Sequence, residues 1–318
     1  MRIGIIGQPC IDEIQMPGDD QPRQSLGGVL YSYAALERIM AGCEKEHDSF
    51  APLTWLSNSD VDVLNTLLSQ FPHMENSEGL WRTDSLTNRV LLNYSSDGSR
   101  TEHCPNVLPR LTGFQLTPAL LSSLDGLFVN MISGFDVGLD TLDTALNTAA
   151  RRPYVHLDIH ALVLGPLSHP EGTGNTHGDG RKPRGVRKWK HWLNVADSVQ
   201  LNEMEVRWLG DPEVTSEQAL LRYIERQRDR LRLKRLIVTR AEKGATMYDV
   251  KTGAVHHASP PELTPVDTTG SGDVFGAAFI NSVLAGETPV GALRESVKWA
   301  SWSATLPTIN DILTSPLL

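Results

Sequence analysis

Short apolar runs alternate with stretches of helical spacing along most of the chain. Each run is a few residues long and ends near a Gly, a Pro or a polar residue, which is typical of strands buried in a sheet. The runs are Arg2–Gly7, Leu127–Met131, Tyr154–Asp158, Val199–Leu201 and Leu236–Thr239. Helices are predicted over Leu30–Met40, Leu139–Ala150 and the charged segment Ser216–Leu231. This alternation predicts an α/β fold with a doubly wound, mostly parallel central sheet flanked by helices.

Two polar segments do not fit this alternation. Ile11–Gly27 is rich in Pro, Gly and Asp, so we expect a loop or a small projecting hairpin there. Asn88–Tyr94 and Arg100–His103 flank the sequence SSDGS, which predicts a hairpin that turns at Asp97 and Gly98. Both segments are expected to lie off the edge of the main sheet.

We expect a single domain over residues 1–318, in which segments near 11–25 and 88–104 form a small β lid. Residues 164–187 are rich in Gly, Pro and His and have no hydrophobic period. Long segments of this kind are uncommon inside compact domains, so a mobile surface loop is predicted there.

Composition and charge restrict the function further. The chain has 318 residues, of which 40% are hydrophobic and 21% are charged, as in ordinary soluble globular proteins. Its net charge of −9 argues against a binder of nucleic acids or anionic membranes. Its three cysteines, Cys10, Cys43 and Cys104, contain no CxxC spacing, which argues against disulfides and zinc. The first apolar run is too short for a signal peptide or membrane span, so a cytoplasmic protein is expected.

The stretch DTTGSGD, residues 267–273, stands directly ahead of a strongly apolar helix. The first N–H groups of a helix have no partner within it and lie at the positive end of its dipole. Gly270 and Gly272 carry no Cβ, so the phosphate of a ligand can approach such groups closely. Asp273 in the first turn can accept a hydroxyl proton as a general base. The structural alternative is a plain turn followed by a carboxylate that complements the dipole.

The sequence DTTGSGDVFGAAF resembles the C-terminal motif of the ribokinase-like (PfkB) family of carbohydrate and nucleoside kinases. This resemblance implies that Asp273 is the catalytic base and that Gly270, Ser271 and Gly272 form the anion hole. It also implies a site for a monovalent cation such as K⁺ near Asp267 and Thr269.

Other motifs fall in the order of this family. The run GQPCID ends at Asp12, whose counterpart in the family binds sugar hydroxyls, and Gly27 and Gly28 match a pair that lets the backbone approach the substrate. A carboxylate that accepts two hydroxyls is a sensible sugar clamp, although Asp12 also fits a solvated position after the first strand. Ser32 stands where sugar kinases usually have Asn.

Asn202 and Glu205, in the sequence NEME, match the family motif that organises Mg²⁺ through water. The same four residues also fit an ordinary helix N-cap. TRAEKG, from Thr239 to Gly244, lies where the family has its nucleotide-binding TxGxxG, with Ala241 in place of the middle glycine. The C-terminal tail also lacks a glycine that is common in the family.

Taken together, the resemblance implies an ATP- and Mg²⁺-dependent phosphotransferase whose acceptor is a hydroxyl of a small sugar or nucleoside-like molecule. A catalytically silent sensor of sugars or nucleosides on the same fold is the alternative. If an edge strand of the lid pairs with that of a second copy, the protein forms a homodimer. A nicotinamide-dependent oxidoreductase is disfavoured because no GxGxxG follows the first strand. A Walker-A kinase is disfavoured because GxxxxGK[ST] does not occur.

The sequence HLDIH places His156, Asp158 and His160 at alternate positions. Residues two apart share one face of a strand, which suggests a metal site. No further His or Cys motif accompanies them, so a structural role is the preferred interpretation, with Asp158 or His160 near the substrate as the next alternative. Tryptophans that we expect to be core or loop anchors are Trp189, Trp192 and Trp208.

Overall fold

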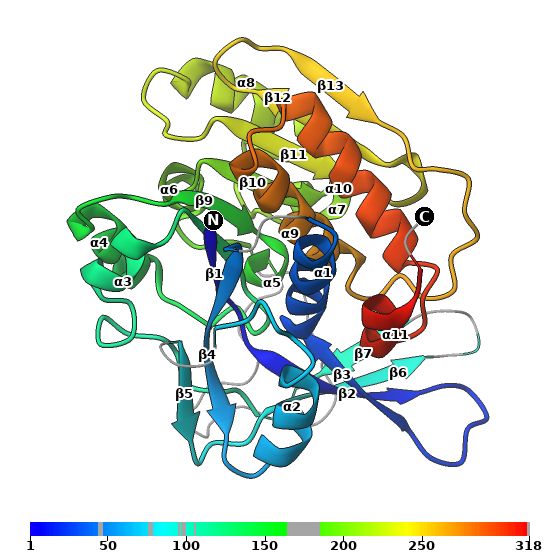
Figure 1. Cartoon of the computed structure of the whole chain (residues 1–318). Coiled ribbons are helices and arrows are strands. Elements are labelled where there is room, and N and C mark those ends of the chain that lie inside the picture. The colour runs from blue at the N-terminus through cyan, green and yellow to red at the C-terminus, as the bar shows by residue number, and fades with distance from the viewer. Residues whose placement is uncertain are drawn as a thin grey trace.

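The computed structural model describes residues 1–43, 47–75, 79–94, 96, 100–104, 106–163 and 185–316. A nine-stranded sheet runs through the centre of the molecule (Figure 1). In sheet order its strands are β13 (Val255–Ala258), β12 (Ala245–Asp249), β11 (Arg235–Thr239), β10 (Ser198–Asn202), β9 (Tyr154–Asp158), β8 (Gly126–Asn130), β1 (Arg2–Ile6), β4 (Ser49–Ser57) and β5 (Leu80–Thr83). All neighbours from β11 to β5 pair in parallel, whereas β12 and β13 are antiparallel. The predicted mostly parallel α/β fold is confirmed.

Helices cover both faces of this sheet (Figure 1). One face carries α1 (Leu30–Ala41), α2 (Val61–Leu68), α9 (Ser271–Leu284), α10 (Pro289–Ser303) and α11 (Ile309–Thr314). The other carries α3 (Pro118–Ser123), α4 (Leu139–Thr148), α6 (Trp189–Val195) and α8 (Glu217–Gln227). Three short helices follow the carboxyl ends of strands, namely α5 (His160–Val163), α7 (Glu203–Arg207) and the 3₁₀ helix η1 (Ala241–Lys243). Because apolar side chains point to both faces, the parallel strands other than the partly exposed edge strand β5 are largely buried on two sides.

Small residues let α9 lie directly on the sheet. A Cβ at Gly276 would come within 2.3 Å of the Phe128 ring on β8, so only glycine permits this approach. The rings of Phe128 and Phe279 flank His156 on β9, each with its centroid 5.2 Å from the imidazole. This packing fixes the position of α9, and therefore of its first turn, against the central strands.

A second, four-stranded sheet has the order β3 (Arg23–Gly28), β2 (Pro9–Gln15), β6 (Asn88–Tyr94) and β7 (Arg100–His103). The segment expected to be a loop or hairpin is a hairpin, since β2 and β3 pair antiparallel. β6 and β7 also pair antiparallel, as predicted, while the turn expected at Asp97 and Gly98 lies outside the described residues. β2 and β6 join the two hairpins in parallel. We refer to these four strands as the cover sheet.

Some predicted boundaries differ from the structure. The helix expected to reach Leu231 ends at Gln227, because its last buried residue is Ile224 and the following residues are charged and exposed. The helix expected to reach Ala150 ends at Thr148. Most of the loop expected near 164–187 lies outside the described residues. Trp189 and Trp192 are buried in the core and Trp208 packs against it, as expected of anchors.

Candidate active site

Polar side chains from several strands meet where the parallel strands end. Asn130 is the last residue of β8 and Asp158 the last of β9, and Gln200 in the middle of β10 pairs with Asp158. The N-terminus of α9, with Asp273 in its first turn, reaches the same edge and contacts these side chains. In open α/β sheets, ligands bind at the carboxyl ends of the strands. We therefore take this edge as the candidate active site.

Gly270 makes the turn that starts α9. Its φ of 75° lies in the left-handed region, and a Cβ there would come within 2.2 Å of the Tyr31 ring. The hydroxyl oxygen of Ser271, the next residue, is buried and has no hydrogen-bond partner among the described residues. A buried donor without a partner is costly unless a ligand satisfies it. The N–H of Ser271 itself donates to the Thr268 carbonyl, so this hydroxyl and the next N–H groups of the helix start are the donors that fit an anion.

Gly272 faces the edge of the sheet rather than a packed neighbour. A Cβ at this position would lie 3.6 Å from the Gln200 amide nitrogen and 3.9 Å from an Asp158 oxygen, both ordinary contact distances. Protein packing therefore does not require glycine here. The missing side chain leaves the helix N-terminus open to a ligand instead.

The carboxylate of Asp273 is held by Asn130. The Asn130 side-chain amide donates to Asp273 Oδ1 over 2.5 Å and to the hydroxyl of Ser32 over 2.9 Å. Ser32 in turn donates to the backbone carbonyl of Asp273 over 3.3 Å. Burial raises the pKa of Asp273 to about 6, and the Asn130 hydrogen bond opposes part of that rise. Sequence reasoning missed Asn130, which no motif marks.

Asp12 is buried in β2, so the solvated alternative does not hold. The thiol of Cys10 donates to its Oδ1 over 3.1 Å. A Cβ at Gly27 on the paired strand β3 would lie 2.2 Å from its Oδ2, so this glycine gives the carboxylate room. Burial, followed by the charges of Asp12 and Asp273, raises the pKa of the Cys10 thiol. The charges of both Asp12 and Asp273 therefore contribute to the electrostatic environment of this thiol.

Gly28 lies where the cover sheet passes into α1. Its φ is 66°, and a Cβ would approach the carbonyl of Gln8 to 2.6 Å. The next residue, Val29, donates its N–H to that same carbonyl. This turn directs α1 so that Tyr31 and Ser32 face the start of α9.

The residues of HLDIH have separate environments. His156 is fully buried within 2.8 Å of the Ser198 hydroxyl, and burial lowers its pKa to about 4. Asp158 accepts from the Gln200 amide, which also donates to the carbonyl of Gly272. Burial, and then the charge of Glu205, raises the pKa of Asp158 to about 7. Within the described part of the chain, no three His, Cys, Asp or Glu side chains gather in a group that could hold a metal ion.

Asn202 and Glu205 form a capping box at the start of α7. Asn202 Oδ1 accepts from the N–H groups of Met204 and Glu205, and Glu205 Oε2 accepts from the N–H of Asn202. Glu205 Oε1 also lies 2.6 Å from both the Asn202 amide and His160 Nδ1. These side chains are used by the protein itself, so they do not form a set of direct Mg²⁺ ligands. Contact through the ion's own waters is the arrangement they fit.

The residues predicted for the nucleotide lie at the same sheet edge. Thr239 ends β11 and is paired with Asn202 of β10. Ala241, which replaces the usual glycine, has a φ of 46°, in the region that favours glycine. Gly244 has a φ of 81°, and a Cβ there would come within 2.0 Å of the Ala258 carbonyl. The loop thus keeps a glycine-type turn despite the Ala241 substitution.

Asp267 and Thr269 form a tight turn ahead of α9. Asp267 Oδ1 accepts from the N–H of Thr269 over 2.8 Å, and the N–H groups of Val266 and Asp267 both donate to the Ala304 carbonyl. This turn connects the start of α9 to the end of α10. These are the contacts that the structure gives for Asp267 and Thr269, the two residues expected near a monovalent cation.

The chain is similar to known carbohydrate kinases in part of its sequence and in its fold. The sequence profile of the pfkB family of carbohydrate kinases matches residues 179–312. No curated protein matches the chain. Among solved structures, ribokinase from Thermotoga maritima superposes with a TM-score of 0.70 at 19% identity, covering 98% of this chain and 97% of that one. A fructokinase with bound ATP from Xylella fastidiosa gives 0.72 at 16% identity, with 98% and 94% covered.

A third similar structure is a pyrophosphate-dependent kinase in the ribokinase family, complexed with a pyrophosphate analog and myo-inositol. It superposes with a TM-score of 0.72 at 17% identity and covers 100% of this chain and 97% of that one. Such identities show the fold alone. The resemblance to the ribokinase-like (PfkB) family is confirmed, since the chain has the fold of these kinases over nearly its whole length and the family's sequence pattern over residues 179–312.

Proposed function

We propose that this protein is an ATP-dependent kinase that transfers the γ-phosphate to a hydroxyl of a small sugar or nucleoside-like acceptor. One observation carries the proposal. Asp273 lies in the first turn of α9, oriented by Asn130, immediately beside a glycine-led helix N-terminus with a buried, unpartnered Ser271 hydroxyl. A base and an anion site side by side are what phosphoryl transfer to a hydroxyl requires.

Asp273 acts as the general base. With a pKa of about 6 it is ionised at neutral pH, yet it binds a proton more strongly than an ordinary aspartate. It takes the proton of the acceptor hydroxyl while that oxygen bonds to the γ-phosphorus and the bond to the ADP oxygen breaks. Asn130 keeps the accepting oxygen in place during this step. Such a base contributes about 10²–10⁴ in rate.

The start of α9 stabilises the charge of the transferring group. The N–H groups near Gly270 and Gly272 and the Ser271 hydroxyl supply donors at the positive end of the helix dipole. These groups are fixed before the ligand arrives, so little reorganisation accompanies the reaction. The nucleotide then extends toward Thr239 and Gly244 along the same edge.

The acceptor lies between Asp12 and Asp273, with Gly27, Gly28 and Ser32 beside it. Asp12 is buried in β2, and a carboxylate in that position is suited to accept from acceptor hydroxyls. The cover sheet acts as a lid that excludes water and so limits hydrolysis of ATP. The polyol in the complex of the pyrophosphate-dependent relative supports an acceptor of this chemical class.

Mg²⁺ would neutralise phosphate charge and would meet Asn202 and Glu205 through its own waters, since both side chains serve the capping box. We further propose K⁺ near Asp267 and Thr269. ATP is the proposed donor because the fructokinase relative holds ATP, whereas pyrophosphate is the donor to test beside it.

The test is phosphoryl transfer from ATP or pyrophosphate to a panel of sugars, polyols and nucleosides, with Asp273→Asn run beside the wild type. We expect acceptor-dependent ADP release that falls by about 10²-fold or more in the variant. Saturable binding of an acceptor without turnover from either donor would replace the kinase by a sensor on the same fold. Turnover that survives in Asp273→Asn would reject this residue as the base.

A further inference from the structure

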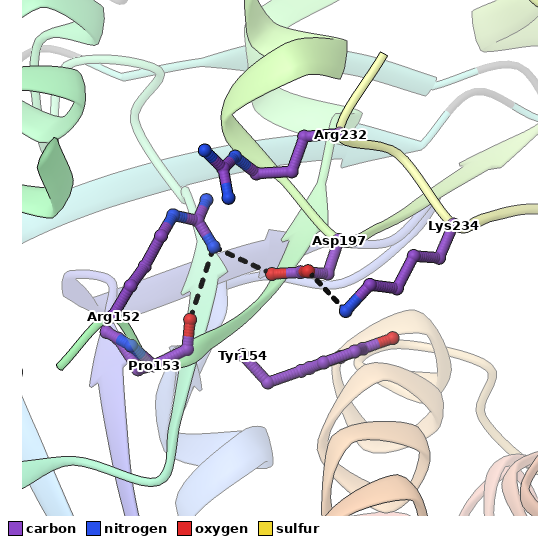
Figure 2. A pocket seen from close by; sticks show the side chains of 6 residues that line it. All are labelled: Arg152, Pro153, Tyr154, Asp197, Arg232 and Lys234. Atoms are coloured by element: carbon purple, nitrogen blue, oxygen red, sulfur yellow. Dashed lines mark hydrogen bonds and ion pairs between the residues drawn. The ribbon is translucent and has the colours of Figure 1, made fainter. Parts of the chain in front are cut away.

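A cavity surrounded by basic side chains lies at the amino ends of the parallel strands, opposite the candidate active site at their carboxyl ends. It has a volume of about 340 Å³. Its lining residues are Arg152, Pro153, Tyr154, Asp197, Arg232 and Lys234 (Figure 2). β9 starts at Tyr154, while Asp197 and Lys234 directly precede β10 and β11. Three cations and one carboxylate therefore gather here on a chain whose net charge is −9.

The single carboxylate of this group is already fully engaged. Asp197 Oδ2 accepts from Arg152 over 2.8 Å and from the N–H of Val155 over 2.9 Å, and Oδ1 accepts from Lys234 over 2.9 Å. Arg152 also donates to the carbonyls of Pro153 and Val195. These bonds hold the strand starts together, and they balance only one of the three positive charges.

Arg232 is the cation that the protein does not use. Its guanidinium makes no hydrogen bond or ion pair with any described residue, and only its backbone N–H is bonded, to Asn194. Figure 2 shows the Arg232 guanidinium turned toward that of Arg152. Burial lowers the pKa of Arg152 and the carboxylate of Asp197 opposes this, whereas the charge of Arg232 lowers the pKa further and that of Asp143 nearby raises it. Asp143 itself already lies 3.2 Å from His191 Nε2.

We propose that this cavity binds the phosphate group of a small phosphorylated molecule. Two guanidinium groups and an ammonium supply more donors than one carboxylate can accept, whereas the three terminal oxygens of a phosphate monoester match them. The monoester carries close to two negative charges at neutral pH, which equals the excess of positive charge. The cavity exceeds one phosphate in size, and the Tyr154 ring, with Lys234 Nζ 5.6 Å from its centroid, gives the organic part an apolar wall.

This site is distinct from the proposed catalytic one. β9 and β10 are five residues long, so about 13 Å of strand separates their first residues from Asp158 and Asn202 at their ends. A molecule bound here cannot take part in the transfer. The inference is therefore independent of the kinase proposal.

Isothermal titration calorimetry with inorganic phosphate and with ribose 5-phosphate, at constant ionic strength, tests the site. Arg232→Gln removes the unpaired cation without breaking an internal bond. Arg230→Gln is the matched control, because Arg230 is an exposed arginine on the same segment that does not line the cavity. Phosphate bound at the start of α9 contributes equally to all three proteins.

We expect Arg232→Gln to weaken one binding event by at least about tenfold, as for the loss of a charge-assisted hydrogen bond. The control should bind like the wild type. Lys234→Gln should weaken the same event. If neither Arg232→Gln nor Arg230→Gln weakens phosphate binding, the proposal is wrong. An equal loss of affinity in both variants would also overturn it, because such a loss would reflect only the change in net charge. Tighter binding of ribose 5-phosphate than of phosphate would establish that the organic part is recognised.

Discussion

Two opposing effects act on the carboxylate of Asp273. Burial raises its pKa to about 6, while the hydrogen bond from Asn130 favours the ionised form. Asn130→Ala removes that bond, so the pKa of Asp273 should rise further. In the pH dependence of kcat/KM, the acid limb should move to higher pH, with kcat lower by about tenfold or more. Asn147→Ala, which removes an Asn–Asp hydrogen bond on the exposed face of α4, is the control that should leave the profile unchanged.

The same carboxylate affects stability. Because its pKa is raised from 3.8 to about 6 by folding, ionisation of Asp273 costs the folded state free energy. This cost is absent below pH 4 and fully present above pH 6. Asp273→Asn should therefore raise the free energy of unfolding by about 1–3 kcal/mol at pH 8 and leave it unchanged at pH 3.5. Denaturant unfolding at both pH values checks this, and a gain that is equal at both would show another cause.

Some residues of the candidate site could be predicted from the sequence, and others could not. DTTGSGD joins glycines, a base and a helix start in consecutive positions, so Asp273 could be chosen from sequence. Asn130 could not, because a single Asn at the end of an apolar strand has the same local pattern whether or not it meets a catalytic group. Its partner Ser32 lies 98 residues away in sequence. Arg232 was equally hidden among the charged residues that follow α8.

At the scale of single elements, the two glycines that start α9 have different roles. Gly270→Ala places a Cβ against the Tyr31 ring at a φ of 75°, so it should destabilise the protein by at least about 2 kcal/mol. Gly272→Ala meets only ordinary contacts and should fold normally, yet its methyl group should obstruct the anion site. We expect a KM for ATP higher by about tenfold or more. Thermal melts and initial rates on both variants separate these effects, and normal kinetics for Gly272→Ala would contradict the anion site.

The capping box on α7 allows the proposed Mg²⁺ contact to be tested without loss of the helix start. Glu205→Gln keeps an acceptor for the Asn202 N–H but removes the charge. The Mg²⁺ concentration at half-maximal rate should rise by about tenfold. Glu203→Gln, on the same helix but paired with Arg240, is the control. An equal Mg²⁺ dependence in both variants would show that Glu205 serves only as a helix cap.

Among the elements, β4 escaped prediction for a physical reason. Pro52 lies in the middle of this strand and pairs with Ile5 of β1, although proline usually argues against a central strand. The neighbouring Gly79 permits the contact, since a Cβ there would meet the Pro52 carbonyl at 1.8 Å. The alternation of strands and helices thus predicted the architecture. A strand that contains a proline and packs against a glycine distant in sequence could not be predicted from the local pattern.

At the scale of the whole molecule, the lid proposal predicts a change in motion. Asp12 belongs to the cover sheet and Asp273 to α9, so an acceptor held by both should restrain one against the other. Hydrogen exchange should slow in β2, β3 and β6 when the acceptor alone is bound, but not in β11 and β12, which lie beside the proposed nucleotide site. Protection that spreads evenly over both sheets would indicate general stabilisation instead. No helix among the described residues is long and apolar enough to cross a membrane.

The position of β1 in the sheet has a consequence for synthesis of the chain. β1 lies between β4 and β8, and the apolar cluster that contains its Ile3 and Ile5 also includes residues of α9, which begins only at Ser271. A nascent chain therefore lacks the α9 part of the cluster around its first strand until most of the polypeptide has left the ribosome. Fragments that stop before α9 should bind chaperones and aggregate, and their release as soluble protein should begin only once α9 has emerged.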